Sequence, residues 1–342
     1  MNGPERFLAA CARRPVDRTP VWMMRQAGRY LPEYQAVRAR VDFLTLCKSP
    51  DLATEVSLQP IERFGMDACV IFSDIMVAVE AMGAPVTFAT GGPHVAAPVR
   101  TLEAVERLHV PDPIEALPFV FEALRRTREE LRDRAALVGF VGGPFTLASY
   151  LVEGGSSRTF AEIKELMCSE PAVAHALLRK LADFVARYAG AQPKEGAHAV
   201  QVFDTWAGEL SPSMYEEFAL PYQRKVIAAI QGAGAPAILY VNGCAGKLKM
   251  LAQTGADVLS VDWRLDLDAV RAALGAGIAL QGNVDPCVLL STPAAVTTAA
   301  RAAMAAAGPV GHILNLGHGV LPTTRLECAR AFVDAPKAAV AT

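Results

Sequence analysis

Eight short apolar runs alternate with helical patterns along almost the whole chain, and this alternation constrains the fold more than any other feature. Near-continuous apolar strands separated by amphipathic helices are typical of a parallel sheet that is covered on its outer faces. Eight such units without a linker or a break in composition predict one α/β domain over residues 1–342, a single (β/α)8 TIM barrel. The runs fall at residues 21–24, 67–72, 136–142, 197–203, 237–241, 257–261, 278–281 and 312–316.

The rival architecture is an open, doubly wound sheet. Such a sheet usually carries a glycine-rich phosphate loop after its first strand, and the sequence RQAGRY at 25–30 lacks that glycine spacing. Proline and glycine mark several element boundaries. Ser49 and Pro50 should open a helix that ends at Gly65, and a long helix over 160–188 should break at Pro171. We expect one helix over 112–134 and a small hairpin within 83–99.

Charge and cysteine content narrow the function classes. The chain has 33 basic and 35 acidic residues, so no basic field indicates nucleic acid or a membrane surface. No apolar run reaches membrane-spanning length, and the N-terminus lacks a signal-peptide core. The seven cysteines form no close pairs of the metal-ligand or redox type, a pattern typical of a reduced, cytoplasmic protein. The expected partner is a small molecule.

Polar residues follow each of the apolar runs, where the carboxyl ends of barrel strands would converge on one face. They are Arg25, Gln26 and Arg29, then Ser73 and Asp74, Gly143, Thr146 and Tyr150, Asp204 and Thr205, Asn242, Asp262, Asn283 and Asp285, and finally Asn315 and His318. The sequence therefore predicts an active site at that face.

Arg25 and Arg29 have the character of an anion clamp, because each guanidinium can hold a carboxylate or phosphate in two parallel hydrogen bonds. The alternative is that both are solvated and pair with nearby acids such as Glu33. Asp74 could be a helix cap rather than a functional carboxylate. His318 lies between two glycines, which would let its imidazole enter a cavity, although a structural role is also open. No His or Cys pair has a recognised metal-ligand spacing.

Several long segments resemble the uroporphyrinogen decarboxylase family, in order and over nearly the whole chain. They are PVWMMRQAGRYLPEY at 20–34, FSDI at 72–75, GFVGGPFTLASYLVEGG at 139–155, VFDTWAG at 202–208, FALPY at 218–222, QGNVDP at 281–286 and NLGHG at 315–319. The resemblance implies a (β/α)8 barrel, a homodimer, and cofactor-independent loss of four acetate carboxyl groups from uroporphyrinogen III. The product would be coproporphyrinogen III, in haem biosynthesis.

The same resemblance implies roles for individual residues. Asp74 would accept the pyrrole N–H hydrogen bonds and stabilise positive charge on the ring. Arg25 would position the acetate or donate a proton, and we expect the first role because a guanidinium is a poor general acid in water. Tyr150 and His318 would contact substrate carboxylates or support Asp74. The remaining expected substrate-binding residues are Gln26, Ala27, Arg29, Phe43, Phe203 and Thr205.

Two other functions stay open at this point. A corrinoid or thiol methyltransferase of the same barrel superfamily would use a His-x-Cys zinc site after the fifth strand. Here that position reads Asn242, Gly243 and Cys244, so one ligand is missing. A tetrapyrrole carrier without catalytic activity is the second alternative, and only turnover would distinguish it from an enzyme.

Overall fold

The computed structural model describes residues 1–89 and 92–337 as an α/β protein built on a curled, parallel seven-stranded sheet. The strand order is β1-β4-β5-β6-β7-β8-β9, and each neighbouring pair is parallel. Seven of the eight predicted apolar runs form these strands. They are β1 (Ala68–Val70), β4 (Ala136–Gly142), β5 (Ala199–Phe203), β6 (Ala237–Tyr240), β7 (Val258–Ser260), β8 (Ala279–Val284) and β9 (His312–Leu316).

The first predicted run, residues 21–24, is not a regular strand. Within it, only Val21 forms a bridge, parallel to Leu314 of β9. Its backbone nevertheless bonds to both sides: Trp22 N–H donates to the Leu314 carbonyl over 3.2 Å, and Asp67 N–H donates to the Val21 carbonyl over 2.9 Å. At other positions a side chain replaces the backbone partner of a regular strand pair: the Met24 N–H donates to Asn315 Oδ1 over 2.9 Å. The segment therefore lies between β1 and β9 without a continuous ladder.

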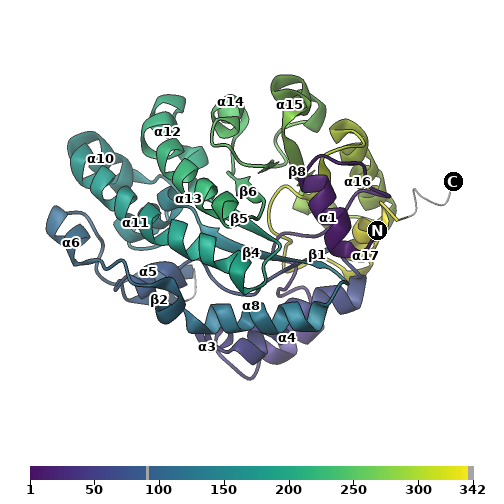
Figure 1. Ribbon diagram of the computed structural model, residues 1–342, viewed down its shortest axis with the longest axis horizontal. Coiled ribbons are helices and arrows are strands. Elements are labelled where there is room, and N and C mark those ends of the chain that lie inside the picture. Colours follow the sequence, from purple (N-terminus) through teal and green to yellow (C-terminus); the bar gives the residue numbers. More distant parts are fainter. Residues whose placement is uncertain (90–91, 338–342) are drawn as a thin grey trace.

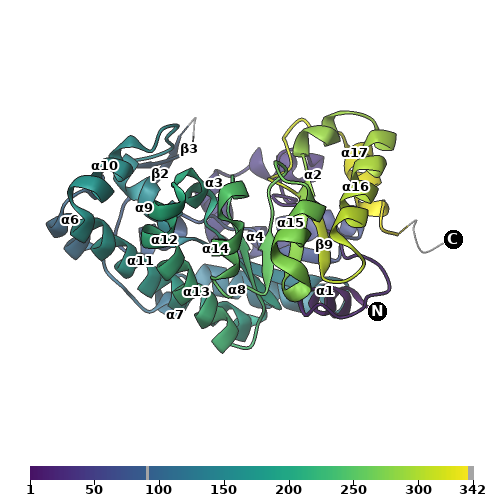
Figure 2. The ribbon, with the colours of Figure 1, turned by 90° about the horizontal axis from the view of Figure 1, so that it is seen from above.

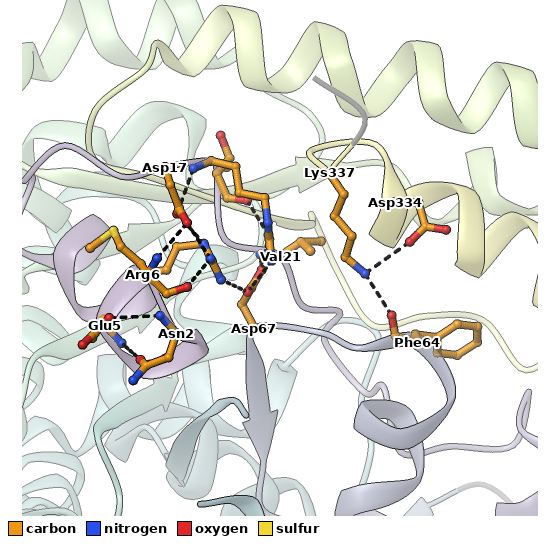
Figure 3. Close-up of polar contacts among 12 residues, drawn as sticks. Asn2, Glu5, Arg6, Asp17, Val21, Phe64, Asp67, Asp334 and Lys337 are labelled. Carbon is orange, nitrogen blue, oxygen red and sulfur yellow. Dashed lines mark hydrogen bonds and ion pairs between the residues drawn. The ribbon is translucent and has the colours of Figure 1, made fainter. Parts of the chain in front are cut away.

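Asp67 fixes this segment from below, as Figure 3 shows. Its carboxylate is 3% exposed and receives Arg6 Nη1 at 2.7 Å and Arg18 Nη1 at 2.6 Å. It also accepts the Val21 N–H over 2.9 Å. Arg6 is in turn bound by Asp17, over 2.6 Å. A buried carboxylate is tolerated only when it is paired and hydrogen-bonded in this way, so the cluster ties the N-terminal residues to the start of β1.

A chain of buried polar side chains crosses the inside of the sheet. Trp22 Nε1 donates to Gln281 Oε1 over 3.0 Å, which joins the segment 20–24 to β8. Gln281 Nε2 donates to Gln201 Oε1 over 3.0 Å and to Ser260 Oγ over 2.9 Å. These four side chains are almost completely buried, so their mutual hydrogen bonds offset the cost of removing them from water.

Helices surround the strands in a ring in Figure 1, and Figure 2 shows the same arrangement from above. The α-helices are α1 (Gly3–Cys11), α2 (Pro32–Arg38), α3 (Phe43–Lys48), α4 (Pro50–Phe64), α5 (Val77–Ala81), α6 (Leu102–Arg107), α7 (Pro113–Ala116), α8 (Pro118–Leu131), α9 (Pro144–Glu153), α10 (Ala161–Ser169), α11 (Pro171–Ala191), α12 (Pro212–Phe218), α13 (Leu220–Gly232), α14 (Leu248–Ala252), α15 (Leu267–Leu274), α16 (Pro293–Ala307) and α17 (Leu326–Asp334). Short 3-10 helices are η1 (Gln192–Glu195), η2 (Thr205–Glu209), η3 (Ala245–Lys247), η4 (Gly275–Gly277) and η5 (Pro286–Leu290).

Most predicted helix boundaries are confirmed. Ser49 caps α4 through the Leu52 N–H, and Gly65 ends it with a left-handed φ of 66° that glycine adopts without strain. The break at Pro171 is also confirmed. The single helix expected over 112–134 is wrong, because α7 ends before Leu117 and α8 begins at Pro118, which has no N–H to continue the earlier helix.

The predicted hairpin is an antiparallel pair, β2 (Val86–Ala89) and β3 (Gly92–Val95). Its tip at residues 90–91 lies outside the described residues, as does 338–342 at the end of the predicted domain. In the described part of the chain, none of the helices has the length and apolar character needed to cross a membrane.

Candidate active site

Four side chains from four separate elements converge at the carboxyl ends of the strands. Arg25 follows the segment 20–24, Asp74 follows β1, Tyr150 lies on α9 after β4, and His318 follows β9. The Arg25 charge acts on the pKa of the other three groups, and the Asp74 charge acts on that of Tyr150. The structure therefore brings together the four residues that the sequence nominated for catalysis.

Asp74 is a partly buried carboxylate with few partners. Burial raises its pKa to about 6, while the Met76 N–H and the Arg25 charge oppose the rise. The Met76 N–H donates to Oδ1 over 2.8 Å. Within the described chain, Oδ2 has no hydrogen-bond partner, so it can accept a bond from a ligand. The cap considered from the sequence is wrong, because Met76 is the N-cap of α5 and that helix has no side-chain cap. The Met76 N–H instead closes a local turn onto one of the two Asp74 oxygens.

Arg25 is held in an unusual backbone conformation beside a glycine. Its φ is 62°, in the left-handed region that residues other than glycine rarely adopt. A Cβ on Gly319 would lie 2.3 Å from Arg25 Cδ, so only glycine lets the arginine lie against that backbone. Neither Arg25 nor Arg29 forms an ion pair with another described residue, whereas Glu33 pairs with Arg63. Both guanidiniums are thus available to an anion.

His318 is contacted by two aromatic rings. Tyr240 lies stacked at 6.0 Å and Trp263 at 6.1 Å between ring centroids. The Tyr240 hydroxyl is 3.1 Å from His318 Nδ1 and donates to the Gly317 carbonyl over 3.0 Å. Burial, together with the charges of Arg25 and Arg264, lowers the pKa of His318 to about 4. The imidazole is therefore neutral at pH 7.

Aromatic side chains form two groups near these polar residues. Phe43 contacts Phe88 at 5.0 Å and Phe72 at 6.0 Å between centroids. Phe72 also packs against Tyr34, at 5.7 Å, and the Arg29 charge acts on the Tyr34 pKa. Rings of this kind present flat apolar surface to a ligand, so one wall joins Phe43 to the region of Arg29.

The second aromatic group is centred on Phe203, at the end of β5. Its ring lies 5.6 Å from Phe140 and 6.0 Å from Tyr240. Thr205 follows in η2, partly buried, and its carbonyl accepts the Asn242 N–H over 3.3 Å. Phe203 thus connects the expected substrate wall directly to the partner of His318.

Gln26 uses its amide inside the protein. It is 1% exposed; Oε1 accepts the Met23 N–H over 3.2 Å and Nε2 donates to the Ala68 carbonyl over 3.0 Å. These bonds hold the turn after the segment 20–24 against β1. Ala27, next in the chain, is partly buried. Gln26 therefore positions the turn that carries Arg25, and substrate binding by its side chain stays a prediction.

The carboxylates of Asp204 and Asp262 also accept hydrogen bonds from groups within the protein. Asp204 is fully buried and accepts Thr146 N–H and Oγ1, each over 2.8 Å, and Gln223 Nε2 over 2.8 Å. Asp262 accepts the Cys244 N–H over 3.1 Å and the Arg264 N–H over 2.9 Å. These carboxylates organise the loops around the site.

Sequence reasoning missed three residues of this site: Tyr240, Trp263 and Arg264. Tyr240 ends an apolar strand and reads as core, so nothing in its context indicates a hydroxyl aimed at His318. Trp263 and Arg264 follow Asp262, which marks the end of an apolar run. That position after a strand was a usable signal, because side chains there line the same face of the sheet.

No metal centre is formed by the described residues, since no group of three or more His, Cys, Asp or Glu could hold an ion. Cys244 is buried, and burial together with the Asp262 charge raises its pKa to about 12. A thiolate, the form that binds zinc, is therefore disfavoured at this position.

Comparisons with known proteins agree on one family. A family model described as uroporphyrinogen decarboxylase (URO-D) matches residues 2–339. A uroporphyrinogen decarboxylase from Myxococcus xanthus is 47% identical over 97% of this chain and 95% of its own length. One from Nitrosococcus oceani is 50% identical over 97% of this chain and 95% of its own. A solved methyltransferase from Methanosarcina mazei shares the fold, with a TM-score of 0.85, 24% identity and 99% coverage of both chains.

Proposed function

The chain belongs to the uroporphyrinogen decarboxylase family, and from this premise we propose that Asp74, Arg25, Tyr150 and His318 form the decarboxylation site. The enzyme is a carboxy-lyase of porphyrin and haem biosynthesis. It converts the four acetate side chains of uroporphyrinogen III to methyl groups and yields coproporphyrinogen III. The observation that carries the assignment of the site is the partly buried Asp74 carboxylate, with one free oxygen, next to an unpaired guanidinium.

The reaction needs an electron sink, and the substrate can supply it. A proton added to a pyrrole carbon makes the ring cationic, and the bond between the acetate methylene and its carboxyl carbon then breaks. The electron pair moves into the ring, CO2 leaves, the methylene carbon takes up a proton, and the ring loses the one it gained. This is the electronic role that a pyridinium plays in cofactor-dependent decarboxylases. The reaction as proposed requires no cofactor.

Asp74 would stabilise the cationic ring. Its desolvated carboxylate is ionised above about pH 6, and its free Oδ2 can accept pyrrole N–H donors. A fixed charge in a poorly solvated site interacts strongly with charge that develops during reaction. Arg25 is close enough to affect the pKa of Asp74, so its guanidinium can hold the acetate that reacts over that carboxylate.

The other residues divide between carboxylates and ring faces. Arg29 would bind a second carboxylate, and Thr205 would donate its hydroxyl to another. His318, neutral and fixed by Tyr240, would contact a substrate carboxylate or support the ring. Tyr150 would do the same from the α9 side.

Phe43, Phe203 and Ala27 supply apolar surface for the macrocycle in this proposal, with Gln26 beside them. The contacts of Phe43 with Phe72 and Phe88 and of Phe203 with Tyr240 support two walls on either side of the polar residues.

The methyltransferase alternative has less support. The zinc site it requires would depend on Cys244, which is buried, whose backbone N–H donates to Asp262, and whose thiol pKa is raised by burial. The structural likeness to the Methanosarcina mazei protein concerns the fold alone.

In this proposal the sheet closes into a single (β/α)8 barrel, and the segment 20–24 occupies the position of the eighth strand. Support comes from its backbone bonds to Asp67 and Leu314 and from the bond of Trp22 to Gln281. One domain over residues 1–342 fits a sheet whose strands run from residue 68 to residue 316. A homodimer rests on the family resemblance. A cytoplasmic location is favoured by seven free cysteines, of which Cys168 and Cys287 are exposed.

The deciding experiment uses the purified, chelator-treated protein under anaerobic conditions with enzymatically reduced uroporphyrinogen III. Products are oxidised and separated by their number of carboxyl groups. We expect stepwise loss from eight carboxyl groups to four without added metal or cofactor. Tight binding without release of CO2 would instead indicate the carrier, and activity that requires zinc and a methyl donor would indicate the methyltransferase.

A further inference from the structure

A third arginine lies at the mouth of the site, and none of the roles above uses it. Arg264 follows β7, two residues after Asp262, and its side chain is 48% exposed. The sequence pattern did not indicate it, because Arg264 lies four residues after the end of β7, behind Asp262 and Trp263. Its position and contacts differ from those of an ordinary surface arginine.

The guanidinium of Arg264 is held in place by two neighbours. Its central carbon lies 4.1 Å from the centroid of the Trp263 ring, a cation–π contact. Nη1 donates to Asn242 Oδ1 over 2.9 Å. An arginine fixed in this way loses less conformational freedom when it binds a ligand than a free one does.

Asp262 pairs with this arginine through Nη1 alone. The contact from Nη1 to Asp262 Oδ1 is long, 3.4 Å. The carboxylate already accepts backbone N–H groups from Gly243, Cys244 and Arg264 itself. Among the described residues, Arg264 Nε and Nη2 have no hydrogen-bond partner. Two nitrogens of the fork, with three N–H donors between them, are therefore free to bind an anion.

Arg264 lies near two of the groups that Arg25 also influences. The charges of both arginines act on the Tyr240 hydroxyl and on His318. The Arg25 charge also acts on Asp74 and Tyr150. Arg25 thus belongs to the part of the site where the reacting acetate would lie, whereas Arg264 reaches His318 through Trp263, whose ring lies 4.1 Å from the guanidinium carbon and 6.1 Å from the His318 ring.

We propose that Arg264, oriented by Trp263 and Asn242, forms a binding subsite for a non-reacting carboxylate of the substrate, one of the propionates. This inference rests on the proposed function. The propionates are present in the substrate, in every intermediate and in the product, so the subsite contributes equally to the binding of all of them. It therefore holds the macrocycle in each of the orientations that bring successive acetates to Arg25 and Asp74.

The test compares Arg264→Gln, Arg264→Lys and the matched control Arg126→Gln. Arg126 is similarly exposed, at 44%, but lies on α8 and pairs with Glu122 and Asp51. We expect Arg264→Gln to raise KM for uroporphyrinogen III, and Kd for coproporphyrinogen III, by the same factor, about 3- to 10-fold. The kcat value should stay within about twofold of the wild-type value, because the lost contact stabilises the bound substrate and the transition state equally.

The lysine variant and the control separate binding from other roles. Arg264→Lys keeps the charge but loses the planar fork, so its KM should lie between those of wild type and Arg264→Gln. Arg126→Gln should change neither constant. An unchanged KM and Kd in Arg264→Gln, or a fall in kcat alone, would overturn the subsite. A wild-type protein that does not release CO2 would refute the proposed function instead, and Kd for coproporphyrinogen III would still test the subsite.

Discussion

Replacement of Asp74 by asparagine should make the enzyme slower and the folded protein more stable. The amide oxygen can still accept the Met76 N–H that Oδ1 accepts over 2.8 Å, so the local structure is kept. The charge that would stabilise the protonated pyrrole is lost. By comparison with removal of one oxyanion-hole group, the barrier should rise by about 2 to 4 kcal/mol, roughly 30- to 1000-fold in kcat.

The gain in stability follows from the pKa of the same group. Burial raises the pKa of Asp74 from 3.8 to about 6, so folding favours its protonated form. Ionisation costs the folded state nothing well below pH 3.8 and most above pH 6. By linkage, the cost is about 3 kcal/mol at pH 8 and about 1.5 kcal/mol at pH 5. Asp74→Asn should recover up to these amounts.

Both effects can be measured on one set of proteins. Urea unfolding at pH 8 and pH 5 gives the free energy of unfolding, and anaerobic single-substrate assays give kcat. Asp268→Asn, an exposed carboxylate on α15, is the matched control and should alter stability by less than about 0.5 kcal/mol. Wild-type turnover by Asp74→Asn would remove Asp74 from the mechanism. A loss of stability that is equal at the two pH values would refute the desolvation argument.

Three further outcomes are expected. The kcat/KM value should rise with pH through about 6 as Asp74 ionises, and this acid limb should vanish in the residual activity of Asp74→Asn; a limb that persists would assign the titration to another group. Asp67→Asn should lower the free energy of unfolding by about 3 kcal/mol, because two arginines lose a buried counter-charge; a change below 1 kcal/mol in urea unfolding would contradict this. Tyr240→Phe removes the hydroxyl that contacts His318 and should reduce kcat/KM about fivefold, the equivalent of one hydrogen bond of about 1 kcal/mol; steady-state rates equal to wild type would show that His318 needs no such support.

The sheet was largely predictable because its apolar runs are short, buried and bounded by polar residues. The bounds of β4 and β9 agree with the predicted runs at 136–142 and 312–316. The strand predicted at 21–24 was wrong, because a hydrophobic pattern indicates that a segment is buried and does not indicate which groups its backbone bonds to. Val21 and Met24 bond to the side chains of Asp67 and Asn315, and only tertiary structure reveals those partners.

For the site, the sequence predicted which residues lie close together but not what each side chain does there. Motif resemblance and position after the strands pointed to Asp74 and His318, and the structure brings them together with Arg25. Neither signal could separate residues that face the ligand from those that build the loop. Gln26 has the same polar character as its neighbours, yet its amide is used by backbone groups. The reverse holds for Tyr240, whose ring reads as core while its hydroxyl reaches the site.

The pairing of the segment 20–24 with β9 has a consequence for synthesis of the protein. Pro20 and Leu314 are hydrogen-bonded partners that leave the ribosome almost at opposite ends of translation. Arg25 is therefore synthesised early, whereas His318 and Gly319, which lie close to it in the folded protein, are among the last residues to be synthesised. Until then the segment 20–24 lacks β9, its partner on one side, and unpaired strand edges favour association with other chains. A nascent chain would need shielding during that interval, and any message truncated before β9 would encode a protein without a site.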